Sequence, residues 1–232
     1  MQLFSGPPVT PDVRSEDFAG RWYLCDDGWL GTLTLALTAP GTNELSGTFA
    51  SERFEEEFRV TGRAGTTHPH AVEFTIHDFN WLPEQCYQGL LLTRTQRTIA
   101  GHSMWKDAPF GFFATRGTRP SLGSYRAGAV RGEDFAGGWT AYLDGELATI
   151  TLEYERDSGL LRGTCTGELG TYRVSGRPDE SVPHRVSLGL FADDGPAVAD
   201  LSGYLMSRPK NAVSGTMSVA GLDLGLVMIR YA

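Results

Sequence analysis

The side chains of this chain best suited to chemistry are two carboxylates and a phenol: Asp26, Asp78 and Tyr87. Each stands where a run of alternating apolar residues begins or ends. Two carboxylates in a shielded setting repel one another and lose hydration, which raises the pKa of at least one of them. Such a group can act as a general acid or base near neutral pH, and Tyr87 could donate a hydrogen bond to a carbonyl or enolate. The set predicts proton transfer without a cofactor.

Other polar and aromatic residues occupy the same runs or the turns beside them. A concave site that joins aromatic walls to a few polar groups is the usual form of a small-molecule pocket. The alternative is that polar residues at strand ends simply face water. The candidate ligand-binding residues are Trp29, Phe49, Ser51, Phe74, Trp81, Gln85, Ser103 and Trp105.

Other kinds of chemistry find no support in the sequence. The five histidines show no metal-ligand spacing, and there is no phosphate-binding loop, dinucleotide fingerprint or nucleophile elbow. We therefore expect no metal and no cofactor. Cys25 and Cys86 fall on outward positions of non-neighbouring strands, which favours neither a disulfide nor a cysteine nucleophile. His70 and His184 each follow a proline at matched positions, so we expect them to close turns.

Composition narrows the classes of partner. A net charge of −8 argues against nucleic acid. The longest apolar runs are too short to span a membrane. Three cysteines are too few and too uneven for a disulfide framework, and the N-terminus shows no secretory signal. We therefore expect a cytoplasmic protein that acts on a small molecule.

The elements that would position these residues are strands. Alternation of period two dominates the chain; in 31–37, Leu33, Leu35 and Leu37 share one face. Turn residues divide the first half into eight predicted strands, near 20–27, 30–37, 44–52, 56–63, 70–79, 85–94, 97–105 and 109–116. Short, evenly spaced strands favour an up-and-down antiparallel barrel, with a β-sandwich as the alternative. Such a barrel encloses room for side chains or one small ligand.

The same pattern occurs twice. The segment SEDFAGRW, beginning at Ser15, returns as GEDFAGGW at Gly132, and FRVTGR (58–63) returns as YRVSGR (172–177). A repeat unit this long is a domain and not a solenoid unit. We therefore expect an all-β protein made of two tandem eight-stranded antiparallel up-and-down β-barrels. The expected divisions are an extended tail over 1–14, barrel 1 over 15–118, a linker over 119–130 and barrel 2 over 131–232.

The two copies differ at positions predicted to face inward. Because odd strands of an up-and-down barrel end at the rim where even strands begin, the polar set of copy one should gather at one mouth of barrel 1. Barrel 2 is then either an inert packing partner or the holder of an apolar ligand. Asp26, Asp78, Gln85, Tyr87, Ser103 and Trp105 in copy one correspond to Leu143, Ala192, Ala199, Leu201, Met217 and Val219 in copy two.

Several short motifs resemble those of a known family. Gly-x-Trp at Gly20 and Trp22, LSGTF (45–49), FRVTGR and the aromatic-x-Gly of YQG (87–89) together resemble the avidin and streptavidin barrels. More broadly, the chain resembles the calycin superfamily, and the resemblance covers nearly all of both copies. It implies the barrel fold.

The resemblance also carries expectations for particular residues. It implies that Arg116 and Arg230, near the end of each copy, pack over the first-strand Trp22 and Trp139 and close one end of each barrel. The biotin-binding residues are largely not matched, since the first-strand Asn of the family falls on Leu24. The resemblance therefore implies a fold and not biotin binding.

Two functions are predicted from these observations. The first is binding of a small, largely apolar molecule in the lumen of barrel 1. The alternative is a cofactor-independent cyclase or isomerase that uses Asp26 and Asp78 as acid and base. A purely structural or interaction module is a third reading, and a homo-oligomer is an expectation by analogy with avidin relatives.

Overall fold

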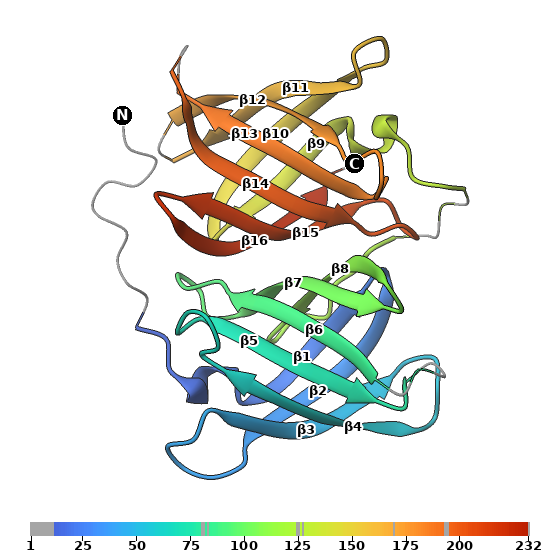
Figure 1. Ribbon diagram of the computed structural model, residues 1–232, viewed down its shortest axis with the longest axis vertical. Helices are drawn as coiled ribbons and strands as arrows, with labels where there is room; N and C mark the ends of the chain where they lie inside the picture. The colour runs from blue at the N-terminus through green and yellow to red at the C-terminus, as the bar shows by residue number, and fades with distance from the viewer. Residues whose placement is uncertain are drawn as a thin grey trace.

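The chain folds into two closed antiparallel barrels of eight strands each (Figure 1). The computed structural model describes residues 12–79, 82, 84–123, 126, 128–168, 170–192 and 195–231. Barrel 1 contains the 3-10 helix η1 (Ser15–Phe18) and the strands β1 (Gly20–Asp26), β2 (Trp29–Leu37), β3 (Glu44–Ser51), β4 (Glu57–Ala64), β5 (Ala71–His77), β6 (Glu84–Leu91), β7 (Thr98–Trp105) and β8 (Ala108–Thr115). Barrel 2 contains η3 (Gly132–Phe135), β9 (Gly137–Leu143), β10 (Glu146–Glu155), β11 (Leu160–Gly167), β12 (Gly170–Pro178), β13 (Arg185–Phe191), β14 (Ala197–Leu205), β15 (Ala212–Val219) and β16 (Leu222–Arg230). The predicted fold class is confirmed.

Alternation of apolar and polar residues decides which face of each strand is buried. In β2, Leu33 and Leu35 are buried inside the barrel, whereas Thr34 and Ala36 are exposed. Each strand pairs with the next in the chain, and the pairing of β1 with β8 closes barrel 1. Pairing of β16 with β9 closes barrel 2 in the same way. Closure leaves no unpaired edge, and the β-sandwich alternative is not adopted.

The phrase repeated at the start of each copy builds the closed end of the barrel. In barrel 1, Phe18 and Trp22 are fully buried, and the Trp22 indole donates to the Phe18 carbonyl at 2.9 Å. The guanidinium of Arg116 lies 4.1 Å from the Trp22 ring centroid and donates to the Ala19 carbonyl at 2.6 Å. Gly20 has a φ of 122°, which other residues rarely adopt. The Phe, Ala, Gly and Trp of the phrase therefore each have a structural role.

Barrel 2 repeats this closed end. The guanidinium of Arg230 lies 4.3 Å from the ring centroid of Trp139, whose indole donates to the Phe135 carbonyl at 2.9 Å. Gly137 has a φ of 116°. The expected packing of an arginine over the first-strand tryptophan is confirmed in both barrels.

The two barrels pack side by side through β6–β8 of barrel 1 and β14–β16 of barrel 2 (Figure 1). Paired hydrogen bonds flank this contact. The Asp27 carboxylate accepts hydrogen bonds from the backbone N–H of Ser207 and from its hydroxyl, the latter at 2.6 Å. The Asp144 carboxylate accepts the same two bonds from Thr93, at 2.6 Å from the backbone N–H and at 2.5 Å from the hydroxyl. Because Asp27 and Asp144 are repeat partners, as are Thr93 and Ser207, the contact has an internal pseudo-two-fold relation. An apolar cluster fills its centre: Cys25, Leu92, Ala100, Phe113, Leu122, Met206, Ala212 and Val227.

The repeat-matched histidines also belong to this contact. Nε2 of His70 donates to the Asp223 carbonyl at 2.7 Å, and Nε2 of His184 donates to the Pro109 carbonyl at 2.6 Å. Both rings thus reach the opposite barrel, a role that the expectation of turn closure did not include. Within the described ranges, no helix has the length and apolar character needed to cross a membrane.

Candidate functional site

Barrel 1 holds a buried polar group at its mouth, the end where β1 and β7 finish and β6 begins. Asp26, the last residue of β1, is 8% exposed. Its Oδ2 accepts hydrogen bonds from Gln85 Nε2 at 2.7 Å and from the Tyr87 hydroxyl at 3.0 Å, and its Oδ1 accepts from the Ser103 hydroxyl at 2.7 Å. Three donors therefore converge on one carboxylate. Because Oδ1 takes one of the three bonds, it keeps an acceptor position for a further donor.

The strand geometry explains why these four side chains meet. Gln85 and Tyr87 are two residues apart on β6, so both point to the same face of the strand. Tyr87 is paired in register with Ser103 on the neighbouring strand β7. Asp26 is paired with Phe112 on β8, which follows β7 around the barrel. The inward faces of β1, β6 and β7 thus bring the four polar side chains together at the mouth.

Burial sets the proton affinity of this group. It raises the pKa of the Asp26 carboxyl from 3.8 to about 7, against the lowering effect of the hydrogen bonds from Ser103, Tyr87 and Gln85. Burial also raises the pKa of Tyr87 well above its usual value, so the phenol stays protonated and donates to Asp26. Asp26 therefore gains and loses a proton near neutral pH, whereas Tyr87 does not.

The side chain of Gln85 leaves one polar atom without a partner. Gln85 is 4% exposed, and while its Nε2 donates to Asp26, its Oε1 is buried with no hydrogen-bond partner among the described residues. A buried, unpaired acceptor costs about 1–3 kcal/mol. An N–H or O–H group of a bound molecule at this point would remove that cost.

A cavity of about 410 Å³ is lined by Asp26 and Gln85 and walled by aromatic rings. Trp29 begins β2 and Trp105 ends β7, and both line this space. Phe79 follows β5, and Phe110 lies in β8. The volume falls within the range of about 300–1,000 Å³ typical of small-molecule sites.

The linker and barrel 2 complete the cavity. Residues 128–130 of the linker line it, as do Ser207 and Arg208 from the loop after β14. The Arg208 guanidinium lies 4.3 Å from the ring centroid of Trp29. Arg53, from the turn between β3 and β4, lies 4.0 Å from the centroid of the same ring. The cavity is therefore shared between the two barrels and is not the property of barrel 1 alone.

Below the polar group, aromatic side chains fill the lumen of barrel 1. The rings of Phe74 and Tyr87 stack at 4.6 Å with an interplanar angle of 4°. Phe112 meets both rings edge-on, at 5.7 Å and 5.2 Å. Each of the three side chains is at most 2% exposed. The cavity thus lies at the mouth, with a packed core beneath it.

The structure brings most of the predicted site residues to this end of the barrel. Asp26, Tyr87, Gln85 and Ser103 form the hydrogen-bonded group, and Trp29 and Trp105 line the cavity. Three further predicted residues are buried nearby: Phe49 and Phe74 belong to the apolar core, and the Ser51 hydroxyl accepts from the backbone N–H of Arg53 at 3.2 Å. Trp81 lies outside the described residues.

Asp78 is the exception, and the prediction that it faces the lumen beside Asp26 is wrong. Strand β5 ends at His77, and Asp78 is an exposed turn residue with a φ of 58°. This left-handed residue breaks the alternation, so the next side chain, Phe79, is the one that turns inward. Phe79 is 4% exposed and meets Phe49 edge-on at 5.1 Å. A carboxylate pair is therefore not formed, and Asp26 stands as a single buried acid.

Sequence reasoning missed the parts of the cavity that come from elsewhere in the chain. Phe79 was hidden by the shift in alternation. Arg208, Ser207 and residues 128–130 were missed because their place depends on how the barrels pack. The alignment of the two copies did contain one signal of a difference between the two mouths. Trp29 in copy one stands where copy two has Glu146.

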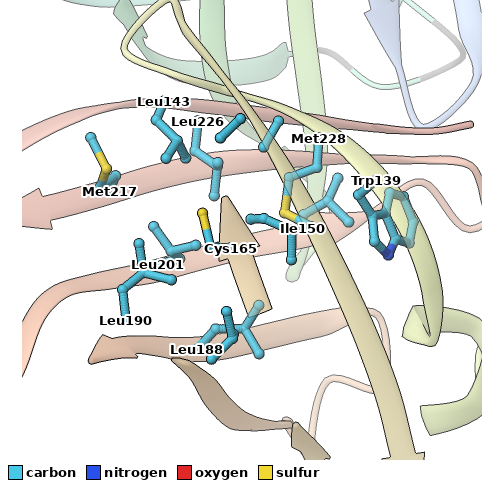
Figure 2. Close-up of a cluster of buried hydrophobic side chains, with 14 of the residues drawn as sticks. Trp139, Leu143, Ile150, Cys165, Leu188, Leu190, Leu201, Met217, Leu226 and Met228 are labelled. Atoms are coloured by element: carbon cyan, nitrogen blue, oxygen red, sulfur yellow. The ribbon is translucent and has the colours of Figure 1, made fainter. Parts of the chain in front are cut away.

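Barrel 2 has no polar group at the matching positions. Leu143, Ala199, Leu201 and Met217 replace Asp26, Gln85, Tyr87 and Ser103, and all four are at most 5% exposed. They belong to one apolar cluster that fills the barrel. Figure 2 shows Leu143, Leu201 and Met217 among the side chains of this cluster.

The described residues hold no further group suited to metal or disulfide chemistry. No three His, Cys, Asp or Glu side chains in the described ranges gather closely enough to hold a metal ion. The three cysteines are free, with Cys25 and Cys165 buried and Cys86 exposed.

No family model matches the chain, and no curated protein does. One solved structure that it resembles weakly is a protein of unknown function from the DUF3598 family of Nostoc punctiforme PCC 73102. The identity is 11%, the TM-score is 0.30, and the match covers 92% of this chain and 95% of the other.

Proposed function

We propose that the mouth of barrel 1 binds a small, largely apolar molecule that carries a hydrogen-bond donor. The apolar body would lie between the rings of Trp29, Trp105, Phe79 and Phe110. The donor would reach the free acceptor positions on Asp26 Oδ1 and Gln85 Oε1. The observation that carries this proposal is the buried carboxylate of Asp26 at the base of an aromatic cavity.

The second barrel argues against a purely structural role for Asp26. Burying a carboxylate costs several kcal/mol, which its hydrogen bonds recover only in part. Barrel 2 closes on the same topology with Leu143 in place of Asp26. Since the fold does not need the polar group, the presence of a buried carboxylate in barrel 1 is best explained by a ligand.

The proposal can be tested with N-phenyl-1-naphthylamine, an uncharged aromatic amine whose fluorescence rises in apolar sites. We expect saturable binding at one molecule per chain. Trp105→Ala should weaken that binding about tenfold, because it removes one aromatic wall. Val219→Ala, at the matching position of barrel 2, is the control and should leave the affinity unchanged. Absence of saturable binding, or equal effects of the two variants, would refute the proposal.

A second candidate function is cofactor-independent proton transfer, as in a cyclase or isomerase. The observation that favours it is the position of Asp26, which lines the cavity, accepts a hydrogen bond from the protonated Tyr87 beneath it and has a pKa of about 7 that suits a general acid or base. With Asp78 outside the site, Asp26 would serve as both the general acid and the general base.

This candidate has its own test. A panel of keto and polyene compounds is incubated with the protein in deuterium oxide and analysed by mass spectrometry. An enzyme would incorporate deuterium or produce an isomer, and Asp26→Asn would abolish that change while still binding N-phenyl-1-naphthylamine, because the asparagine carbonyl oxygen accepts a hydrogen bond but does not take up a proton. Binding without any such conversion supports the first function.

A further inference from the structure

The rim of the cavity carries cationic side chains against the overall charge of the protein. Arg208 and Arg53 contact the ring of Trp29, and the Lys106 ammonium lies 4.7 Å from the ring centroid of Trp105. Over the part of the chain that the structure describes, no ion pair involves any of these three cations. The chain as a whole has a net charge of −8. These three cations outnumber the two carboxylates that line the cavity, Asp26 and Asp27, and an excess of positive charge beside a cavity favours a negatively charged ligand.

The internal repeat shows what is particular about Arg208. Its counterpart in barrel 1 is Arg94, which extends toward the mouth of barrel 2 and pairs with Glu146 there at 3.3 Å. At the mouth of barrel 1, the position of that glutamate is taken by Trp29. Arg208 therefore contacts an aromatic face where Arg94 contacts a carboxylate.

Among the described residues, the guanidinium of Arg208 contacts the Trp29 ring and donates no hydrogen bond. A guanidinium stacked on a ring keeps its N–H donors in its own plane, where they can bind an oxyanion. The nearby carboxylate of Asp27 is occupied by the backbone N–H and hydroxyl of Ser207. The carboxylate of Asp144 is occupied in the same way by Thr93, so the two mouths do not differ in this carboxylate. The difference between the mouths is the missing glutamate.

We infer that the ligand of this cavity is an amphipathic organic acid, with a carboxylate or similar oxyanion bound by Arg208 at the rim and a hydrogen-bond donor bound by Asp26 and Gln85 at the base. This inference rests on the proposed function, because it names the class of molecule that the same cavity takes. The aromatic walls contact the body between the two polar ends. Arg53 and Lys106 add to the positive potential around the acidic end.

Two matched probes separate this inference from the proposed function. 6-Anilinonaphthalene-2-sulfonate and N-phenyl-2-naphthylamine share the same aromatic amine, and only the first carries a sulfonate, which lies across the naphthalene from the amine. Both are titrated by fluorescence into the wild-type protein, Arg208→Gln and Arg94→Gln. Arg208 and Arg94 are both exposed, so neither substitution removes a buried side chain from the fold.

We expect the wild-type protein to bind the sulfonate about tenfold more tightly than the uncharged amine. Arg208→Gln should remove that preference by weakening the binding of the sulfonate far more than that of the uncharged amine, whereas Arg94→Gln should change neither affinity. If the two probes bind equally well and Arg208→Gln affects neither, the inference is overturned while the proposed function stands. If neither probe binds, both are overturned.

Discussion

Replacing Asp26 with asparagine should remove a pH dependence from the stability of the protein. The pKa of Asp26 is higher in the folded protein, at about 7, than the value of 3.8 expected for the unfolded chain. A group of this kind contributes its full stability below the unfolded pKa, and the contribution is lost as the pH rises through the folded pKa. The wild-type protein should therefore become less stable, relative to Asp26→Asn, as the pH rises from 4 to 7.

The size of the effect follows from the difference between the two pKa values. Each pKa unit corresponds to about 1.36 kcal/mol. The difference between 3.8 and about 7 therefore gives about 4 kcal/mol in total, of which about 2 kcal/mol falls between pH 5 and pH 7. Above pH 8 the difference between wild type and variant should become constant.

Urea unfolding of wild type and Asp26→Asn at pH 5, 6, 7 and 8 measures this difference directly. Other titrating groups contribute almost equally to both proteins and cancel in the subtraction. A ¹³C-carboxyl NMR titration of Asp26 gives the folded pKa independently of unfolding. If the stability difference stays constant from pH 5 to pH 8, and the Asp26 signal titrates near pH 4, the buried site described above does not exist in solution.

Three further outcomes are expected. Arg116→Ala should lower the free energy of unfolding by about 2–4 kcal/mol, measured in urea, because it removes a cation–π contact and hydrogen bonds at the closed end of barrel 1; a loss under about 0.5 kcal/mol would contradict that role. The combined variant Asp26→Leu, Gln85→Ala, Tyr87→Phe and Ser103→Met, which makes the whole polar group apolar as in barrel 2, should be as stable as wild type or more so at pH 8 yet fail to bind N-phenyl-1-naphthylamine; retained binding would show that the ligand does not need the polar group. Asp27→Asn should weaken the contact between the barrels by about 1–2 kcal/mol, so the backbone amide of Ser207 should exchange its hydrogen faster, and unchanged exchange would show that this bond is dispensable.

The sequence was sufficient to predict the barrels and much of the polar group. Period-two alternation is a local property, and it placed Leu33 and Leu35 inside barrel 1. The same parity placed Asp26, Gln85 and Ser103 on inward positions, because all three lie within regular strands or at their ends. The internal repeat then showed that this polar set has no equivalent in the other copy.

The errors and omissions arise where local alternation stops. Asp78 lies one residue beyond β5 and has a left-handed backbone conformation. As a result the Asp78 side chain faces outward, and the Phe79 side chain takes the inward position that was expected for Asp78. The contribution of Arg208 depends on the packing of one barrel against the other, which no local pattern encodes. The histidines at 70 and 184 were matched correctly between the copies, but their contacts with the opposite barrel depend on the same packing.

The central claim is that the mouth of barrel 1 binds a ligand through Asp26 and its neighbours. A crystal structure of the protein soaked with N-phenyl-1-naphthylamine tests it most directly. The account predicts one molecule between Trp29 and Trp105, with its amine within hydrogen-bonding distance of Asp26 Oδ1 or Gln85 Oε1. Density for the amine inside barrel 2 or on the outer surface, with the mouth of barrel 1 holding only water, would contradict it.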